Sequence, residues 1–396
     1  MLLSIDNSIM REYKICGIAT KVLGIKWFML DNLRFVGKHG FKPCIICSPE
    51  KELKELDLRG IEYIPLDIKR GYSSPFQVIS SIVKLCRIFR QQRFDIIQYT
   101  SSNAALFASI AGWLSHIPIR IYCQWGMAYS EYKGIRRLFY RTAAKITCLF
   151  STTVQPDSFA NLNYAVKDKL YPSWKGNVIH KGSASGVNLE KFSISHKSDW
   201  RSSVRKQLTI PEDHTVFGFV GRLVRDKGLN ELFEAFMDLD DPQCTLLIVG
   251  PFYDIKSLNP VLYDKAVKHP RIIFVGSVNN AECYYAAMDF FVLPSYREGF
   301  GSVVIEAAAL AVPSICSNIK GPTDFVKDGY NGLLCDVKSA KSLNESFKRA
   351  LSLSPSQYQT MSYNAYETAK NDFDADLFKQ YFLKDRLSLL EQKGII

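Results

Sequence analysis

The sequence predicts an α/β protein with two doubly wound domains, each a parallel sheet covered by helices on both faces. Three observations support this class. The 396 residues suffice for two large cores, and a composition of 47% hydrophobic and 22% charged residues is ordinary for a folded chain. Short apolar runs alternate with amphipathic stretches, as in parallel sheets. The alternation loosens near residues 186–200 and then restarts, which places a domain boundary near residue 190.

The N-terminal domain, residues 1–190, opens with a short apolar run at 13–20, which we interpret as its first strand. Further runs of this length predict strands at 42–49, 62–67, 94–101, 118–125 and 149–156. Helical spacing of apolar residues predicts helices at 26–40, 75–93, 103–115 and 135–147, the first of them closed by Gly40. The longest apolar segment, 104–119, is too short and too interrupted to span a bilayer, so it predicts a buried helix followed by a strand.

The C-terminal domain, residues 191–373, repeats the pattern. Apolar runs stand at 214–223, 244–251, 272–278, 290–295, 312–317 and 331–335, with helical stretches at 230–239, 281–288 and 302–311 between them. Residues 374–396 form an amphipathic helix, which we expect to pack back toward the N-terminal domain. Two such domains in tandem would create a cleft, and ligands of these sheets bind beyond the carboxyl ends of the strands.

The cysteines and the N-terminus indicate a cytoplasmic protein. The N-terminus has no apolar stretch followed by a cleavage site, and most of the ten cysteines stand in apolar runs. Cys44 and Cys47 form a C-x-x-C, which is either a redox or zinc pair or a strand that happens to carry two cysteines. The strand is favoured because no second Cys/His pair stands at zinc spacing. The six histidines are scattered, so no protein-built metal site is predicted.

The net charge of +11 is unevenly distributed: residues 1–190 carry +12 and the remainder carries −1. The basic half is therefore expected to face something anionic, such as a membrane surface, a lipid diphosphate or a nucleic acid. Within it, Arg137, Arg141 and Lys145 recur every four residues beside apolar and aromatic side chains. Such a helix can dock on the anionic face of the cytoplasmic membrane. The alternative is a sheet-covering helix with a solvated basic face.

Two stretches of the second half carry charged residues where a strand gives way to a helix. Arg222 and Lys227 follow a strand, and two cations beside free helix N–H groups suit a diphosphate. Glu298 precedes a Gly-Phe-Gly turn. Glu306 lies in an apolar helix, where a carboxylate needs a bonded partner such as sugar hydroxyls. The alternatives are a solvated loop for the cations, a helix cap for Glu298 and an exposed helix position for Glu306.

In this order, VGRLVRDKG, VLPSYREGFGSVVIEA and NGLLC resemble the retaining glycosyltransferases of GT-B fold called glycosyl transferases group 1. Residues 182–192, GSASGVNLEKF, are similar to an element of the branch that builds bacterial capsule and O-antigen units on a lipid carrier. The resemblance runs over nearly the whole chain and is strongest at 182–336. It implies two Rossmann-like domains with a cleft between them.

The resemblance assigns roles to the matching positions. Arg222 and Lys227 would neutralise the donor diphosphate and Glu298 would contact the donor sugar, which makes these three the catalytic candidates. Glu306 would bind the ribose hydroxyls. The other donor-binding positions form two groups. At the glycine turn lie Gly299, Phe300, Gly301 and Ser302, where backbone amides would touch the phosphates; on the strand and turn at 272–278 lie Val275, Gly276, Ser277 and Val278, which would flank the nucleobase. No metal or other cofactor is implied, because cations and the helix dipole would stabilise the departing nucleotide diphosphate.

The N-terminal half departs from the family pattern. Trp125 stands in the place of a family histidine, and the usual His-x-His-Thr-Pro-Lys run corresponds to QYTSSNA, residues 98–104. Trp125 either reads a lineage-specific acceptor or marks a protein that has lost its activity. The residues assigned to the acceptor side are Thr20, Lys21, Asn103, Trp125 and Gly126.

The function predicted from these observations is transfer of a sugar, with retention, from a nucleotide sugar, UDP-linked, to a lipid-diphosphate-linked saccharide in bacterial surface polysaccharide synthesis. The enzyme would work in the cytoplasm, peripherally associated with the inner face of the membrane. Two alternatives come from other classes. A UDP-sugar 2-epimerase of the same architecture would need acid/base side chains that the N-terminal half does not offer. A basic nucleic-acid binder is disfavoured because the cations are spread over several helices without a base-reading motif.

Overall fold

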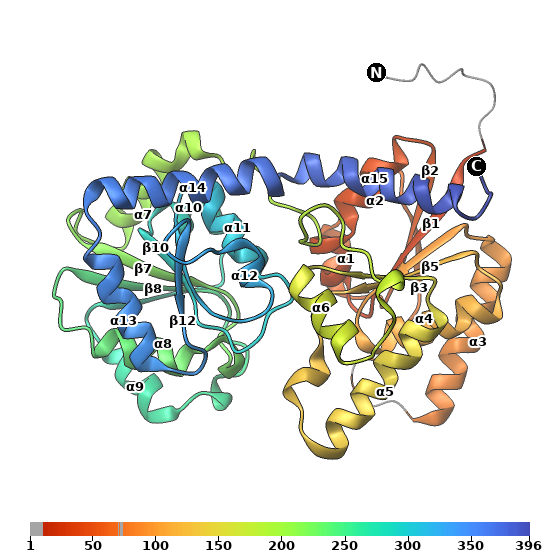
Figure 1. The fold of residues 1–396 in the computed structure, drawn as a ribbon, viewed down its shortest axis with the longest axis horizontal. Coiled ribbons are helices and arrows are strands. Elements are labelled where there is room, and N and C mark those ends of the chain that lie inside the picture. Colours follow the sequence, from red (N-terminus) through yellow and green to blue (C-terminus); the bar gives the residue numbers. More distant parts are fainter. Residues whose placement is uncertain (1–10, 70, 72–73) are drawn as a thin grey trace. The chain divides into compact units, whose positions relative to one another are not determined.

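The computed structural model describes residues 11–69, 71 and 74–396 and divides the chain into two compact units (Figure 1). Unit 1 comprises the chain up to His180 together with Phe378–Ile396, and unit 2 is Lys181–Leu377. The boundary predicted near residue 190 lies inside unit 2. The reason is a pair of backbone hydrogen bonds: the Val187 N–H donates to the Phe373 carbonyl at 2.7 Å, and the Ala375 N–H donates to the Val187 carbonyl at 2.9 Å.

Unit 1 is built on a parallel six-stranded sheet with the order β3-β2-β1-β4-β5-β6. Its strands are β1 (Tyr13–Ile18), β2 (Phe41–Cys47), β3 (Glu62–Pro65), β4 (Ile96–Tyr99), β5 (Ile119–Gln124) and β6 (Thr153–Pro156). Successive residues of a strand point to opposite faces. Ile15 accordingly belongs to the core on one face and Cys16 to the core on the other, and neighbours on β2 and β4 divide in the same way.

The helices of unit 1 are α1 (Val22–Phe28), α2 (Leu30–Gly37), α3 (Pro75–Gln92), α4 (Ser102–Leu114), α5 (Gly134–Phe150) and α6 (Phe159–Lys167). Helices α3, α4 and α5 lie side by side, with α4 packed against both neighbours (Figure 1). The single helix predicted at 26–40 is in fact two, because Met29 leaves the helical conformation at φ −121° and ψ −35°. Helix α6 was not predicted, although Ser158 caps it by accepting from the Asn161 N–H.

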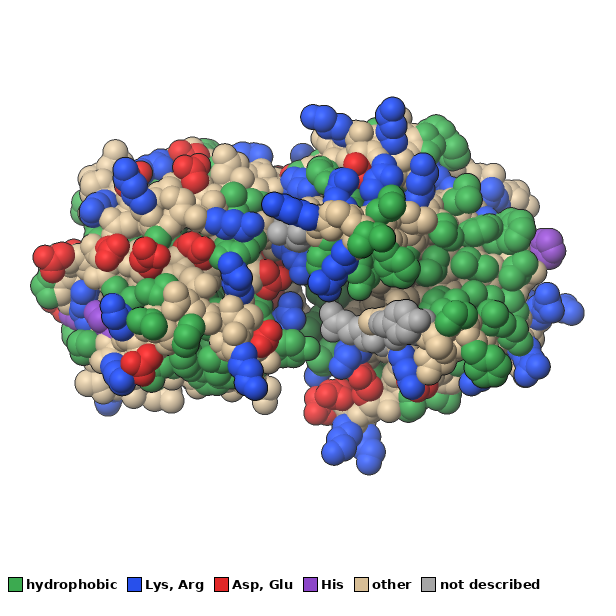
Figure 2. All heavy atoms as spheres, turned by 90° about the horizontal axis from the view of Figure 1, so that it is seen from below, with side chains coloured by type: hydrophobic (Ala, Val, Ile, Leu, Met, Phe, Trp, Pro, Cys, Tyr) green, Lys and Arg blue, Asp and Glu red, His purple; other side chains and the backbone are tan. Residues whose placement is uncertain are grey.

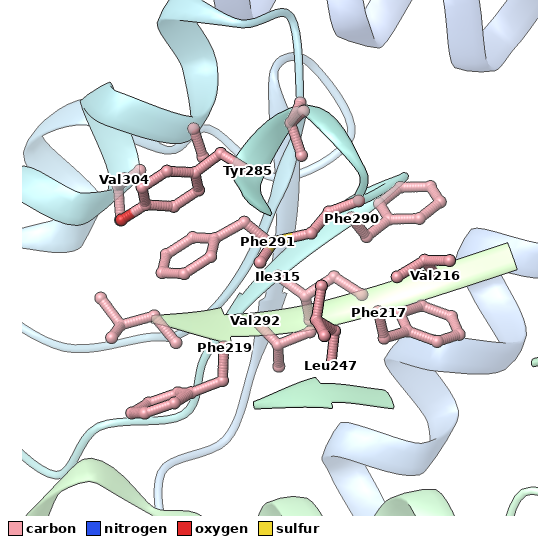
Figure 3. Close-up of a cluster of buried hydrophobic side chains, with 14 of the residues drawn as sticks. Val216, Phe217, Phe219, Leu247, Tyr285, Phe290, Phe291, Val292, Val304 and Ile315 are labelled. Carbon is pink, nitrogen blue, oxygen red and sulfur yellow. The ribbon is translucent and has the colours of Figure 1, made fainter. Parts of the chain in front are cut away.

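Unit 2 repeats the topology, with the sheet order β12-β11-β10-β7-β8-β9. Its strands are β7 (Thr215–Val220), β8 (Cys244–Val249), β9 (Ile272–Gly276), β10 (Phe290–Leu293), β11 (Ser314–Ser317) and β12 (Gly332–Cys335). Figure 3 shows Phe219 and Phe291 on opposite sides of this sheet, and both rings are buried in the core of unit 2. The prediction of two doubly wound parallel sheets is confirmed for both units.

The helices of unit 2 are α7 (Lys197–Gln207), α8 (Leu229–Met237), α9 (Pro260–Lys268), α10 (Ala281–Ala286), α11 (Ser302–Ala309), α12 (Pro322–Phe325), α13 (Ala340–Leu351) and α14 (Pro355–Phe373). The sequence pattern missed α7, because its buried face includes a cation instead of an apolar residue. Arg205 is fully buried there and its guanidinium contacts Asp289 at 2.7 Å, while Arg201 contacts the same carboxylate at 2.9 Å.

The last helix, α15 (Ala375–Glu391), enters unit 1 through its residues from Phe378 onward. Arg386 is almost completely buried and donates to Gln98 Oε1 at 2.8 Å. Asp385 accepts from Gln155 at 2.9 Å and from Asn177 at 2.6 Å. Paired polar groups therefore hold this helix on the sheet in addition to its apolar contacts. In the described part of the chain, no helix is both long enough and apolar enough to cross a membrane.

Candidate functional site

The strand order of unit 2 reverses between β7 and β10, and ligands of doubly wound sheets bind outside the carboxyl ends of the strands at such a point. Lys227 lies in the loop after β7, and Glu298 lies in the loop after β10. Lys227 Nζ is 2.6 Å from Glu298 Oε1, with the two side chains 18% and 12% exposed. The Ser295 hydroxyl donates to the same carboxylate oxygen at 2.7 Å. Strand order thus joins two candidates that stand far apart in the sequence.

Glycine makes the close approach of these two loops possible. Gly228, directly after Lys227, has φ +73°, and a Cβ there would lie 2.0 Å from the Pro294 carbonyl oxygen. Any side chain would therefore push the loop after β7 away from the loop after β10. Gly301 has φ +88° and directly precedes α11. Both glycines supply left-handed conformations that other residues adopt only at a cost.

The amino end of α11 presents free backbone donors. The N–H groups of Phe300, Gly301 and Ser302 donate to none of the residues that the structure describes. The buried Phe300 ring packs on Phe373 with centroids 5.2 Å apart, which anchors the turn. Free N–H groups at the positive end of a helix suit an anion such as a phosphate.

Glu306 lies one helical turn further along α11, in a largely apolar setting. The buried Tyr285 hydroxyl on α10 donates to Glu306 Oε2 at 2.9 Å. Burial raises the pKa of the Glu306 carboxyl to about 7, against the lowering effect of the Tyr285 hydrogen bond and of the Lys191 charge. Figure 3 shows the Tyr285 ring beside Val304 of α11. The carboxyl can therefore change its charge near neutral pH, and its second oxygen can accept from a ligand.

Three polar side chains around these carboxylates were missed by the sequence reasoning: Tyr285, Ser295 and Lys191. Lys191 contacts Glu282 at 3.7 Å and contributes to the electrostatic environment of Glu306. No local signal identifies them, because tyrosine, serine and lysine at these positions fit any helix, strand end or loop. Only the placement of α10 and of the β10 strand end reveals their role.

The remaining donor-side candidates stand apart from the Lys227–Glu298 pair. Arg222 is exposed and its guanidinium lies 5.1 Å from the centre of the Tyr253 ring. Val275 and Gly276 end β9, with Ser277 and Val278 in the loop that follows. The Gly276 carbonyl accepts from the Gly250 N–H at 2.8 Å. This loop belongs to the same carboxyl edge of the sheet, because parallel strands end together.

In unit 1 the candidates also gather at the carboxyl edge. Thr20 is buried after β1, and Lys21 pairs with Glu50 at 3.3 Å. Asn103 donates to the Lys69 and Gly71 carbonyls, at 2.7 Å each, so its amide serves the local backbone.

Trp125 and Gly126 follow β5 at this edge. The Trp125 ring packs on Phe28 with centroids 5.0 Å apart, and Gly126 turns the chain at φ +83°. One part of the Trp125 ring thus packs inside unit 1, and the exposed part of the ring is available to a ligand.

Comparison with known proteins gives two family matches. Residues 14–158 match the model described as glycosyl transferase 4-like, and residues 201–368 match the model described as glycosyl transferases group 1. The chain is 28% identical over 370 residues to the capsular polysaccharide biosynthesis glycosyltransferase CapM of Staphylococcus aureus, covering 93% of this chain and 95% of that protein. The C-terminal part of the chain thus matches the glycosyl transferases group 1 and its N-terminal part matches the glycosyl transferase 4-like model, and the chain is a glycosyltransferase.

Two further likenesses agree with this assignment. An α-1,3-N-acetylgalactosaminyltransferase of Campylobacter jejuni, named for the acceptor N,N'-diacetylbacillosaminyl-diphospho-undecaprenol, is 24% identical, with coverage of 86% of this chain and 89% of that one. The crystal structure of Anabaena Alr3699/HepE in complex with UDP superimposes with a TM-score of 0.77 at 20% identity, over 95% of this chain and 100% of that one. The fold of this glycosyltransferase is accordingly GT-B, and the family decides the enzyme class against the 2-epimerase.

In the basic helix α5 of this glycosyltransferase, two of the cations that were expected to face a membrane form ion pairs within the protein. Arg137 and Arg141 of α5 both contact Asp168, at 3.3 and 2.8 Å. These ion pairs hold α5 against the end of α6, so two of the three cations expected to meet lipid phosphates already have a partner. The sequence could not reveal these ion pairs, because Asp168 belongs to a different element: it is the C-cap residue of α6. Lys145 makes no side-chain hydrogen bond or ion pair with the residues that the structure describes.

The cysteine pair of this glycosyltransferase lies in a strand. Cys44 and Cys47 belong to β2, and both thiols are buried. Burial raises the pKa of Cys47 to about 12, which keeps the thiol protonated and unreactive. No three His, Cys, Asp or Glu side chains come together as a metal site in the described ranges of the chain.

Proposed function

We propose that this glycosyltransferase moves a sugar from a UDP-linked donor, with retention of the anomeric configuration, to a saccharide carried on a lipid diphosphate. The observation that carries the proposal is the Lys227–Glu298 ion pair at the switch point of unit 2, directly before the free N–H groups of α11. A cation, a carboxylate and helix N–H groups at one edge of a sheet can hold a diphosphate and a sugar side by side.

Different residues would bind different parts of the nucleotide-sugar donor. The Lys227 ammonium and the α11 N–H groups would take the diphosphate, with Arg222 as a second cation at the rim. Glu298 would accept from hydroxyls of the donor sugar while its other contact orients Lys227. Glu306 would accept from the ribose hydroxyls through the oxygen that Tyr285 leaves free. Val275 and Val278 would flank the base.

The transfer step follows from these contacts. The bond between the anomeric carbon and the diphosphate oxygen breaks, and its electron pair stays on the nucleotide diphosphate, where Lys227 and the helix N–H groups stabilise the charge. The acceptor hydroxyl attacks the anomeric carbon from the same face. Its proton passes to the departing diphosphate oxygen, so the missing N-terminal histidine is not required for this step.

The acceptor class rests on the relatives. The Campylobacter relative is named for a diphospho-undecaprenol acceptor, and the Staphylococcus relative for capsular polysaccharide synthesis. We infer an acceptor of the same chemistry for this chain. Trp125 and Gly126, at the carboxyl edge of unit 1, would contact its saccharide.

The metal requirement and the stereochemistry test this proposal together. Transfer is expected to persist in EDTA, because Lys227 and the α11 N–H groups supply the stabilisation that a metal would otherwise give. The product is expected to keep the anomeric configuration of the donor by NMR. Loss of activity that magnesium or manganese restores, or an inverted anomer, would contradict the mechanism.

We further propose that unit 1 docks on an anionic membrane surface. Helix α3 exposes Phe76, Ile79 and Val83 in one stripe, and the stripe continues with Arg87 and Arg90. Helix α5, on the far side of α4, exposes Ile135, Leu138 and Phe139. Figure 2 shows hydrophobic side chains mingled with Lys and Arg on the side of unit 1 that carries α3–α5. This combination suits a bilayer interface, where rings insert and cations meet phosphates.

Sedimentation with vesicles measures this docking. We expect recovery with vesicles containing phosphatidylglycerol, lower recovery with phosphatidylcholine alone, and a decline with salt. Phe76→Ser with Phe139→Ser should reduce recovery at least threefold, because the two variants remove the apolar contacts. The matched control is Val261→Ser with Tyr363→Ser. It removes two exposed apolar side chains from unit 2 and should leave the recovery with vesicles unchanged. Equal, salt-independent recovery in the supernatant with both lipids would contradict docking and leave the donor site untouched.

A further inference from the structure

Unit 1 contains a pocket of about 400 Å³ between α5, α6 and the short 3-10 helix η3 (Ser173–Lys175). The volume falls in the range of ordinary small-molecule sites, about 300–1,000 Å³. The apolar part of its lining is Cys148, Leu149, Val166, Leu170, Tyr171 and Pro172. The polar part consists of three lysines, Lys145, Lys169 and Lys175.

Among the described residues, the three lysines have no acidic partner. Lys145 and Lys169 are exposed, and their side chains form no hydrogen bond or ion pair with the described residues. Lys175 is partly buried and donates to the Leu149 carbonyl at 3.2 Å. Burial lowers the pKa of Lys175, and the nearby positive charge of Arg120 lowers it further. No acid belongs to the described lining, so an anion would relieve the mutual repulsion of these ammonium groups.

The pocket opens beside exposed apolar side chains. Leu149 is 69% exposed and Trp174, next to Lys175, is 79% exposed. Tryptophan and lysine together are typical of residues that sit at the headgroup level of a bilayer. A mouth of this composition fits a ligand that emerges from a membrane better than one that diffuses in water.

The lining also argues against a sugar or a nucleotide as the occupant. Tyr171 supplies the one hydroxyl among the described lining residues, and it already donates to Gln124 at 3.1 Å. The site therefore lacks the convergent hydrogen-bonding groups that would read a base or a saccharide. An apolar chain with an anionic head matches both parts of the lining.

The pocket is separate from the acceptor side. Helix α5 leads from the carboxyl end of β5 back to the amino end of β6, and Lys145, Cys148 and Leu149 lie in its last two turns. They therefore lie at the amino edge of the parallel sheet, whereas Trp125 and Gly126 follow β5 at the carboxyl edge.

We propose that this pocket binds one anionic phospholipid, with an acyl chain against Leu149, Val166 and Leu170 and the phosphate among Lys145, Lys169 and Lys175. The site goes beyond sugar transfer and beyond non-specific docking. Its contribution is a stoichiometric lipid contact at the edge of unit 1 opposite to the acceptor side.

Titration of the full-length protein with short-chain phosphatidylglycerol below its critical micelle concentration tests the site, because a monomeric lipid cannot act as a membrane surface. Calorimetry is expected to give one site per chain. Short-chain phosphatidylcholine should bind at least tenfold more weakly, and so should glycerol phosphate, which lacks the chain. Lys145→Gln with Lys169→Gln should weaken phosphatidylglycerol binding at least tenfold, and Leu149→Glu should weaken it similarly by placing a carboxylate at the mouth.

The control for charge is Lys341→Gln with Lys348→Gln, which removes two exposed lysines from α13 of unit 2 and should leave the dissociation constant unchanged. Circular dichroism would verify that every variant is folded. An unchanged dissociation constant in both pocket variants, or the absence of saturable binding to the wild type, would overturn the proposal. Neither result bears on donor transfer or vesicle sedimentation, which are measured separately.

Discussion

Replacement of Lys227 by alanine is expected to lower kcat/KM for sugar transfer by about thirty- to a thousandfold, or about 2–4 kcal/mol of transition-state stabilisation. Two effects act in the same direction. The departing diphosphate loses the cation that neutralises its charge. Glu298, only 12% exposed and now without Lys227, is left as an uncompensated carboxylate beside the incoming phosphates.

The matched control for Lys227→Ala is Lys268→Ala. Lys268 also forms an ion pair, with Asp264 at 2.8 Å, but the two side chains are 73% and 62% exposed. Exposed pairs contribute little, so this variant should transfer sugar as the wild type does. Release of nucleotide diphosphate measures both rates, and thermal melting shows whether each protein is folded. Turnover near the wild-type level in a folded Lys227→Ala protein would remove Lys227 from the donor site.

The affinity for the nucleotide donor is expected to fall as the pH drops below about 7 and to become independent of pH in Glu306→Gln. Burial raises the folded-state pKa of Glu306 from 4.5 to about 7, so the carboxylate predominates only above this pH. Ribose hydroxyls donate to the carboxylate, and each pH unit below the pKa should therefore cost about tenfold in affinity. At higher pH, Glu306→Gln should bind about ten- to a hundredfold more weakly, because a charge-assisted hydrogen bond is lost.

Two readouts separate this effect from a loss of structure. An acid whose pKa is raised on folding opposes folding as the pH rises through that range, so Glu306→Gln should melt at a higher temperature than the wild type at neutral pH. Tyr285→Phe removes the hydrogen bond that lowers the pKa of Glu306, so the binding transition should move to higher pH. A wild-type affinity that does not change between pH 5 and pH 8, measured by calorimetry, would exclude Glu306 from donor binding.

The fold was predictable because its signals are local. Short strands that are buried on both faces read as apolar runs, and their alternation with helical stretches indicates a doubly wound sheet. The predictions missed the helices α6, α7, α9, α13 and α14, and took two helices for one at 26–40. Helix α7 buries the charged Arg205 against Asp289, and the run at 26–40 breaks at Met29, which the spacing of its apolar residues does not signal.

The sequence alone determined which chemical groups are present and in what order: two cations after β7, a carboxylate before a glycine turn, and a carboxylate inside an apolar helix. The tertiary structure decided their partners. It joined Lys227 to Glu298, Tyr285 to Glu306, and Gln98, in the place of a family histidine, to Arg386 of the last helix. It also paired Arg137 and Arg141 with Asp168 and left the three lysines of the pocket without an acidic partner among the described residues. Local patterns specify which face of an element is buried, but contacts between distant residues depend on strand order and helix placement, which no single stretch of sequence contains.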